Sequence, residues 1–323
     1  MIGSLKVVQT RCRDPYRNLA LEEYLLESVE PGQCVLYLWQ NQNTVVIGRN
    51  QNPWKECKTA LLEQEGGKLA RRLSGGGAVF HDLGNLNFTF LVPQEDYDVP
   101  RQMEVIRRAA QSFGLRAEVS GRNDILAEGR KFSGNAFYKN GRQAYHHGTL
   151  LVAADLEKLT RYLTPSKAKL QAKGVDSVRS RVVNLKELNP EITVDSLKEA
   201  LISAFSEVYG LPVQRLGDLP DSDSIRRLTE RNGSWEWNYG RKMPFSWEWE
   251  HRFSWGGVQI GLEVESGIVR RAKVWSDAMD YRLSQQLEDR LAGQRFRRED
   301  LAKAAPAEEQ AGECWQKLLE EME

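Results

Sequence analysis

The chain has 323 residues, more than one average domain, so we expect one large and one small domain. Lysine and arginine together number 45, as do aspartate and glutamate, and this balance gives no general field that would attract nucleic acid or an anionic membrane. Hydrophobic residues make up 41% and charged residues 28%, as in ordinary globular proteins in water, and no stretch is apolar for long enough to span a bilayer.

The first half of the chain reads as short strands interrupted by helices. Hydrophobic periodicity predicts a helix over 18–29, strands over 35–39, 44–47 and 86–92, and a helix over 103–113. Strand-like runs lie on both sides of Asn140-Gly141, which is the strongest two-residue turn signal, so we expect a hairpin within 125–151.

The second half continues with helices over 155–163 and 196–209. Five of the nine tryptophans then fall within 235–255, and we interpret this segment as a seam between domains. Beyond it the pattern predicts a hairpin over 258–264 and 268–274, followed by helices over 284–292 and 307–322. Strand clusters with inserted helices and no βαβ rhythm predict an α+β fold, which we divide into residues 1–248 and 249–323.

The run of residues 71–85 is the most informative stretch. Its three consecutive glycines, 75–77, let another molecule approach the backbone, and Arg71 and Arg72 just before them supply planar positive charge. The run has neither the Gly-Lys-Ser/Thr of a Walker A loop nor the spaced glycines of a dinucleotide fold. A tight turn is the plainer interpretation, but the flanking arginines and polar tip favour a site where an anionic group meets an apolar one.

Lys131 lies among small and polar residues in a predicted strand. Most lysines simply face solvent. The alternative is an ammonium that neutralises a phosphate or a developing oxyanion, and the neighbouring glycines favour this interpretation modestly because they leave room for a ligand.

The adjacent histidines His146 and His147 invite a metal site, but neighbouring residues on a strand point to opposite faces, and no third ligand is evident. A two-residue turn at Asn140-Gly141 would pair Lys131 with Leu150 and put His146 on the face of the lysine. A one-residue slip or bulge would put His147 there instead. Spacing alone leaves both arrangements open.

Nucleophilic catalysis has little support in the sequence. Ser74 and Ser133 have no histidine and carboxylate partners nearby, no GxSxG elbow exists, and no cysteine lies between Cys57 and Cys314. The four cysteines show no CxxC spacing, and the N-terminus has no apolar core of signal-peptide length. We therefore expect neither a zinc site nor a disulfide framework, and a cytoplasmic location.

Taken together, these motifs resemble those of lipoate–protein ligases, in the biotin/lipoate ligase superfamily. The resemblance covers almost the whole chain, and the ordered set of motifs is very specific. The matching stretches are residues 44–49, 51–57, 71–85, 121–124, 130–134, 146–151, 173–175, 177–182 and 253–258.

The resemblance implies a large catalytic α+β domain with mixed β-sheets flanked by helices, plus a small α+β accessory domain. It also implies a two-step reaction with ATP and Mg²⁺ as co-substrate and no tightly bound cofactor. Lipoate first attacks the α-phosphate of ATP, which releases pyrophosphate and leaves lipoyl-AMP. A lysine of an apo lipoyl domain, from a 2-oxoacid dehydrogenase E2 subunit or from glycine cleavage H protein, then takes the lipoyl group. We expect a monomer.

The resemblance also assigns residues. Lys131 matches the essential lysine and would contact both the lipoate carboxylate and the α-phosphate. Asp124 is a candidate for holding Mg²⁺ through the substrate phosphates. Val46, Val79 and Phe80 are candidates for the lipoate slot, although ordinary core positions explain them equally well. The residues implied to bind ATP or lipoyl-AMP are Arg72, Gly76, Gly77, Ala78, Val79, Phe80, Asn85, Asp124, Lys131, His147 and Gly148.

Four other functions are weighed against this one. Octanoyl transfer looks to a cysteine beyond the lysine, which is absent, and biotin ligation looks to an arginine–glycine alternation that the glycine run lacks. A lipoyltransferase that uses preformed lipoyl-AMP shares the same motifs and is separated only weakly. A non-catalytic protein that binds lipoate or lipoyl domains is disfavoured because Lys131 and Arg72 are intact.

Overall fold

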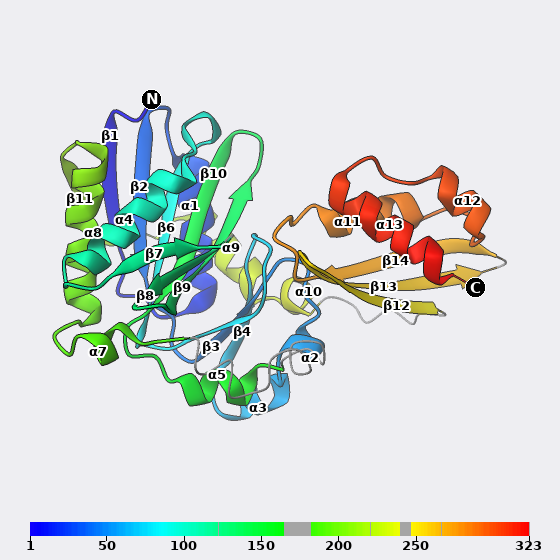
Figure 1. Ribbon diagram of the computed structural model, residues 1–323, viewed down its shortest axis with the longest axis horizontal. Coiled ribbons are helices and arrows are strands. Elements are labelled where there is room, and N and C mark those ends of the chain that lie inside the picture. The colour runs from blue at the N-terminus through cyan, green and yellow to red at the C-terminus, as the bar shows by residue number, and fades with distance from the viewer. Residues whose placement is uncertain (122, 165–181, 220, 240–246, 266, 323) are drawn as a thin grey trace.

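The computed structural model describes residues 1–121, 123–164, 182–219, 221–239, 247–265 and 267–322, which form two domains (Figure 1). Three of the stretches named above, 173–175, most of 177–182 and part of 121–124, lie outside these residues, as does part of the tryptophan-rich seam. The architecture confirms the predicted α+β class.

An eight-stranded mixed sheet in the order β11-β1-β2-β6-β10-β9-β8-β7 forms the centre of the large domain. The strands β11, β1 and β2 run parallel, and the pairs from β2 to β7 are antiparallel. Its strands are β1 (Ser4–Gln9), β2 (Gln33–Trp39), β6 (Asn85–Pro93), β7 (Ala117–Ser120), β8 (Asp124–Ala127), β9 (Arg130–Lys139), β10 (Gln143–Leu151) and β11 (Val213–Leu216).

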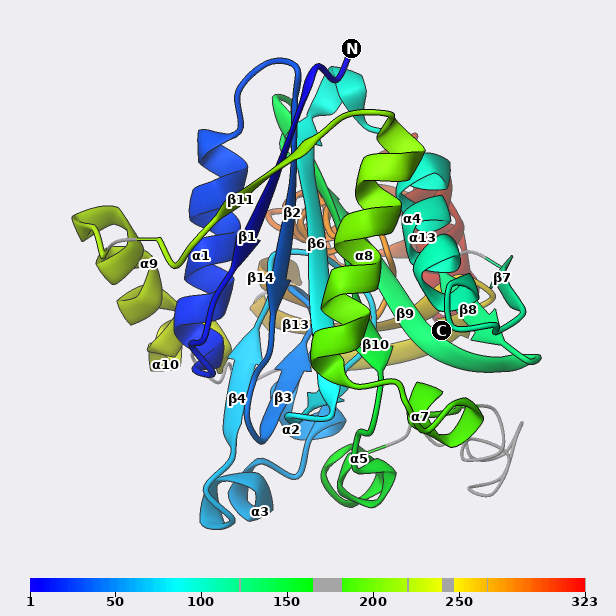
Figure 2. The same ribbon diagram turned by 90° about the vertical axis from the view of Figure 1, so that its left-hand side faces the viewer.

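Helices cover both faces of this sheet. On one face, α4 (Val99–Gln111) and α8 (Val194–Tyr209) pack on an apolar cluster that includes Phe88, Phe90 and Phe205 (Figure 2). The other face carries α1 (Pro15–Ser28) and a three-stranded sheet of β4 (Lys68–Arg71), β3 (Thr44–Ile47) and β5 (Val79–His81). Among the described residues, this domain also contains the 3₁₀ turn η1 (Gln94–Asp96) and the helices α2 (Pro53–Glu56), α3 (Thr59–Gln64), α5 (Leu156–Tyr162), α7 (Leu185–Leu188), α9 (Asp223–Gly233) and α10 (Trp235–Asn238).

The helix α1 begins three residues before the predicted start because Asp14 caps it. The Asp14 carboxylate accepts hydrogen bonds from the backbone N–H groups of Tyr16 and Arg17, and Pro15 fits the first helical position. Within the otherwise apolar buried face, Asn18 and Glu22 lie one turn apart and are both buried. Helix α1 therefore carries two polar side chains into the interior beside the sheet.

The β9–β10 hairpin has a different register from the one that a two-residue turn would give. Asn140 accepts hydrogen bonds from the N–H groups of Arg142 and Gln143, so the turn is longer and Ala144 lies opposite Lys139. Leu150 consequently pairs with Ser133.

A bulge in β9 then places the side chain of Lys131 on the opposite face of the sheet. Leu126 pairs with Lys131 but Ile125 pairs with Ser133, which leaves Phe132 as the extra residue. Phe132 joins the apolar core, and Lys131 turns to the face that carries Gly134 and His147. Of the two arrangements that spacing left open, the structure has the one with the bulge and His147.

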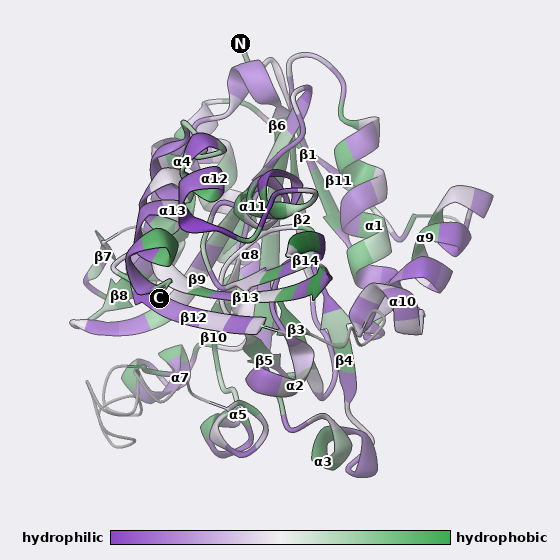
Figure 3. Cartoon of the chain, turned by 90° about the vertical axis from the view of Figure 1, so that its right-hand side faces the viewer, coloured by the Kyte–Doolittle hydropathy of each residue, from purple (hydrophilic) through white to green (hydrophobic). Residues whose placement is uncertain are grey.

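The small domain is a three-stranded sheet of β12 (Trp247–Phe253), β13 (Gly256–Glu265) and β14 (Ile268–Ser276), covered on one side by helices (Figures 1 and 3). Its core centres on Trp315 and Leu287, from α13 (Glu309–Glu321) and α11 (Leu283–Leu291), and α12 (Arg298–Lys303) lies beside them. The predicted boundary after residue 248 falls inside β12. In Figure 3 the central strands of the large sheet are largely hydrophobic, while the outer helix α9 is largely hydrophilic.

Candidate active site

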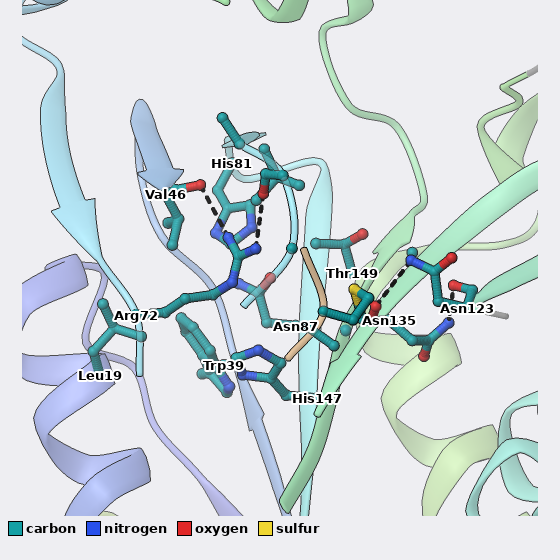
Figure 4. A pocket seen from close by; sticks show the side chains of 18 of the residues that line it. Leu19, Trp39, Val46, Arg72, His81, Asn87, Asn123, Asn135, His147 and Thr149 are labelled. Atoms are coloured by element: carbon teal, nitrogen blue, oxygen red, sulfur yellow. Dashed lines mark hydrogen bonds between the residues drawn. The ribbon is translucent and has the colours of Figure 1, made fainter. Parts of the chain in front are cut away.

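A cavity of about 280 Å³ lies between the large sheet and the three-stranded sheet (Figure 4). Strands β2, β6, β10 and β9 form its floor, and β3, β5 and the glycine-rich loop (residues 72–78) form its roof. Leu19 of α1 and Met279 of the small domain complete the wall. The cavity is therefore built from both domains.

The floor is a row of side chains that pair across four strands. Trp39 lies opposite Asn87, Asn87 opposite Thr149, and Thr149 opposite Gly134. Because neighbouring strands lie about 4.8 Å apart, the row runs roughly 14 Å from β2 to β9. The cavity is thus elongated across the strands, with different chemistry at its two ends.

At the β9 end, the Nζ of Lys131 lies 2.6 Å from an oxygen of Asp124. The two side chains are 34% and 36% exposed, so this ion pair is open to exchange with a ligand. The lysine passes over Gly134, where a Cβ would lie 3.3 Å from Nζ. The missing side chain on β9 therefore makes room for the ammonium.

In the interior, His147 belongs to a buried chain of hydrogen bonds. Its Nδ1 lies 2.8 Å from Glu22 Oε1, and its Nε2 lies 2.8 Å from Ser74 Oγ. Since a carboxylate only accepts hydrogen bonds, the Nδ1–H of His147 donates to Glu22. Thr89 donates to the same Glu22 oxygen at 2.6 Å, and Trp39 Nε1 donates to Thr89 at 3.1 Å.

In the folded protein Ser74 contacts His147, which in turn contacts the carboxylate of Glu22, although neither residue is near Ser74 in the sequence. They come from β10 and α1. Ser74 is nevertheless fully buried, does not line the cavity, and accepts a hydrogen bond from Arg72 Nε at 3.0 Å. It is placed to hold the base of the glycine-rich loop, not to attack a ligand.

The two arginines of the run, Arg71 and Arg72, donate hydrogen bonds to backbone carbonyl oxygens. Arg72 donates to the carbonyl oxygens of Gly75, Gly77 and Val46, at distances of 2.7 to 3.2 Å, and burial lowers its pKa to about 10. Arg71 likewise donates to several backbone carbonyls, and burial lowers its pKa to about 10 as well. Both guanidinium groups therefore fix the shape of the glycine-rich loop and of its neighbours.

The small domain sits against the same loop. The N–H of Gly76 donates to the carbonyl oxygen of Ala278 at 3.0 Å, and a Cβ on Gly75 would lie 2.4 Å from that oxygen. Glycine at position 75 is thus required for this contact between the domains, because any side chain would collide with backbone.

Residues 14–206 match the family described as Lipoyl protein ligase A/B catalytic domain, and residues 242–311 match Bacterial lipoate protein ligase C-terminus. The chain belongs to the lipoate–protein ligase family. The fold and the motifs expected from the resemblance agree with this membership, and the membership makes the chain an enzyme of the ligase class.

Three solved structures show how far the likeness extends. LipL1 of P. falciparum, in complex with lipoate, is 28% identical with a TM-score of 0.85, over 98% of this chain and 99% of that one. A bi-partite lipoate protein ligase from Thermoplasma acidophilum, from a study of that ligase and its E2 lipoyl domain, is 28% identical with a TM-score of 0.65, over 75% and 99%. A lipoate-protein ligase A bound with ATP is 27% identical with a TM-score of 0.63, over 74% and 99%.

Most of the residues that the ligase resemblance pointed to do line the cavity. They are Val46, Arg72, Gly76, Gly77, Ala78, Val79, Lys131, His147 and Gly148. Asp124 reaches the cavity through its ion pair with Lys131.

Two expected residues lie elsewhere. Phe80 alternates with Val79 and His81 on β5, so it points away from the cavity and packs against Tyr162, with ring centroids 5.4 Å apart. Asn85 is fully buried and donates to Asn87, which takes the position on the cavity floor. The side chains of Phe80 and Asn85 therefore do not line this cavity, whereas those of Val79 and Asn87 do.

Several residues that line the cavity were not predicted from the sequence, among them His81, Trp39, Asn123 and Met279. His81 had a signal, because it shares a face with Val79 on a strand of period two. Burial, helped by the positive charge of Arg72, lowers the pKa of His81 to about 3, so it is neutral at physiological pH. Among the described residues, no group of three or more His, Cys, Asp or Glu could hold a metal ion, and no helix is long and apolar enough to cross a membrane.

Proposed function

We propose that this chain is an ATP-dependent lipoate–protein ligase, which forms lipoyl-AMP with release of pyrophosphate and then transfers the lipoyl group to a lysine of an apo lipoyl domain. One observation carries the proposal. A single elongated cavity joins a cation, Lys131, to an apolar wall that contains Leu19, Val46 and Val79. Lipoate has the matching form, an anionic carboxylate on an apolar chain.

The first step must bring two anions together, the carboxylate of the acid and the α-phosphate of ATP. The Lys131 ammonium offsets their repulsion, and its effect grows as the ligands exclude water. In the free protein Asp124 holds this ammonium at 2.6 Å. When the anions bind, Lys131 turns to them, and the freed Asp124 carboxylate becomes available to a Mg²⁺ ion carried by the phosphates.

The glycine-rich loop lies across the cavity from the floor, where its backbone N–H groups can meet the phosphates. The N–H of Gly76 now donates to Ala278, so binding through that group requires the contact with the small domain to open. Such an opening would be a movement of the small domain between activation and transfer.

In the second step the amine of the acceptor lysine attacks the acyl carbonyl of the mixed anhydride, the C–O bond to phosphate breaks, AMP leaves with the electron pair, and the amine loses a proton to the solvent. His147 has partners on both ring nitrogens, Glu22 and Ser74, so we assign it a place in the cavity wall and no proton transfer. This agrees with the role that the resemblance implied for it.

The solved relatives support the ligands. LipL1 binds lipoate, ligase A binds ATP, and the T. acidophilum ligase works with an E2 lipoyl domain. We therefore propose lipoate and ATP as the substrates of this chain and E2 lipoyl domains as its acceptors. Mg²⁺ as part of the co-substrate, glycine cleavage H protein as a further acceptor, a monomeric state, a cytoplasmic location and the lack of a tightly bound cofactor stay predictions.

The test is to incubate the chain with lipoate, ATP, Mg²⁺ and an apo lipoyl domain, and to measure the mass of the domain. We expect one lipoyl group to be added, and none when a variant of the domain lacks its acceptor lysine. An adduct that forms only from supplied lipoyl-AMP would show a transferase. No adduct under either condition would contradict both activities and favour a binding protein.

A further inference from the structure

The end of the cavity away from Lys131 holds two buried polar side chains with free hydrogen-bonding atoms. His81 is 3% exposed and Asn87 1% exposed, and both line the cavity. The Nε2 of His81 and the Nδ2 of Asn87 have no partner among the described residues. Since a buried polar group without a partner costs free energy, this end of the cavity is suited to a ligand that supplies one.

The proton position on His81 follows from its neighbours. Asn18 Nδ2 lies 2.8 Å from the carbonyl oxygen of Gln40 and 3.2 Å from that of Cys12, which fixes the orientation of the Asn18 amide. The same Nδ2 donates to Asn41 Oδ1 at 2.9 Å, so the other atom of the Asn41 amide, Nδ2, faces His81 Nδ1 at 3.2 Å. The Nδ1 atom therefore accepts a hydrogen bond, and the ring proton lies on Nε2.

Asn87 is less constrained. Its Oδ1 accepts from Asn85 Nδ2 at 2.9 Å, and the other amide atom of each residue is free among the described residues. Turning both amides together preserves their mutual hydrogen bond, so Asn87 can present either an N–H or a carbonyl oxygen. The fixed donor at this end is therefore His81, and Asn87 is an adaptable neighbour.

Strand geometry places this donor at the far end of a linear acyl chain. Lys131 passes over Gly134 on β9, and Asn87 lies two strands away, roughly 10 Å at the usual strand spacing. His81 packs edge-on against Trp39, one strand further, with ring centroids 6.2 Å apart. Figure 4 shows His81 and Trp39 on one side of Asn87, and Asn123 and Asn135 on the other.

We propose that His81 is a specificity-determining residue, whose Nε2–H selects acids with acceptor atoms at the end distal to the carboxylate. Lipoate has two ring sulfurs there, whereas octanoate ends in a methyl group. A methyl group fills the space and leaves the N–H unpaired, which is how a polar site rejects an analogue. Sulfur is a weak acceptor, so the preference is on the order of tenfold. The inference rests on the proposed function, because it takes Lys131 as the carboxylate site.

The test is to measure kcat/KM for lipoate and for octanoate from pyrophosphate release at saturating ATP. His81→Phe keeps an aromatic ring beside Trp39 but lacks the N–H, so we expect the preference for lipoate to fall severalfold, with the octanoate value unchanged or raised. His81→Gln restores a donor and should recover part of the preference. Thr149→Val is the matched control, because it removes a polar group nearer Lys131 and should leave the ratio of the two values unchanged.

A second measurement uses the wild-type chain alone. The nitrogen-15 shifts of His81 should show a protonated Nε2 and a bare Nδ1, and lipoate should move the Nε2 signal more than octanoate does. A proton on Nδ1, equal responses to both acids, or an unchanged preference in His81→Phe would each overturn the inference while leaving the ligase activity standing. A wild-type chain that activates neither acid would overturn the proposed function and this inference with it.

Discussion

At the β9 end of the cavity, Lys131 and Asp124 hold one another in an ion pair that is about one-third exposed. At the interior end, Glu22 is 2% exposed and joins His147 and Thr89 in a closed chain of hydrogen bonds. An exposed pair contributes little to stability, so its members are free to exchange partners with a ligand. A buried carboxylate must keep its donors, because each lost partner leaves an uncompensated polar group. Charge that acts in chemistry is thus kept apart from charge that maintains shape.

The largest effect is expected where the exchangeable charge is removed. Lys131→Ala should lower lipoyl-AMP formation by on the order of a thousandfold, because nothing then offsets the repulsion between carboxylate and phosphate. Pyrophosphate release in the presence of lipoate and ATP measures the effect. The melting temperature should stay close to that of the wild type, since the side chain is partly exposed. Near-normal pyrophosphate release would refute the assigned role.

The interior end should respond in the opposite way, with a loss of stability. Glu22→Leu leaves the His147 Nδ1–H and the Thr89 hydroxyl without their acceptor, so we expect the free energy of unfolding to drop by about 2–4 kcal/mol. Urea denaturation measures the drop.

Glu22→Gln is the matched control for this prediction, because it keeps one acceptor oxygen and should lose less. A Glu22→Leu variant as stable as the wild type would show that the hydrogen-bonded chain does not maintain the interior end.

The sequence predicted the residues at the β9 end of the cavity better than those at the interior end. Lys131 stands out among glycines, and the family motifs identify it without any knowledge of packing. Its orientation, however, depends on the bulge at Phe132. The pairing of β8 with β9 that produces this bulge cannot be inferred from the spacing of residues along the sequence.

The interior end is built from contacts between residues that are far apart in the sequence. Glu22, Ser74 and His147 come from a helix, a loop and a strand that meet only in the folded chain. Hydrophobic periodicity treats Glu22 as one polar residue on an amphipathic helix, and nothing local shows that its carboxylate is buried. The same limit explains Phe80, whose exclusion from the cavity follows from alternation on a three-residue strand that was recognised only as part of a motif.

A smaller effect on stability should follow from acidification, because the interior end contains a neutral histidine. The pKa of His81 is lowered by burial and by the positive charge of Arg72 to about 3, below the ordinary value of 6.5. Between these pH values the unfolded chain binds a proton that the folded chain does not, so the free energy of unfolding falls as the pH falls. From pH 7.5 to pH 5 the loss due to His81 is roughly 2 kcal/mol.

His81→Phe should therefore lose about 2 kcal/mol less than the wild type over the same pH range, as measured by urea denaturation at both pH values. His146 serves as the comparison, since burial lowers its pKa to about 3 as well and its contribution remains in the variant. Equal losses in the wild type and in His81→Phe would mean that His81 takes up a proton without unfolding.

The smallest effect on stability is expected at the β9 end of the cavity, from Asp124→Asn. The ion pair with Lys131 is partly exposed, so the free energy of unfolding should change by no more than about 0.5 kcal/mol. Activity separates the two roles open to this carboxylate. If Asp124 helps hold Mg²⁺ on the phosphates, the variant should need a higher Mg²⁺ concentration for half-maximal pyrophosphate release. If Asp124 only holds Lys131 in place, the rate should change by the same factor at every Mg²⁺ concentration. A large loss of stability would instead place this pair with the structural charges of the interior end.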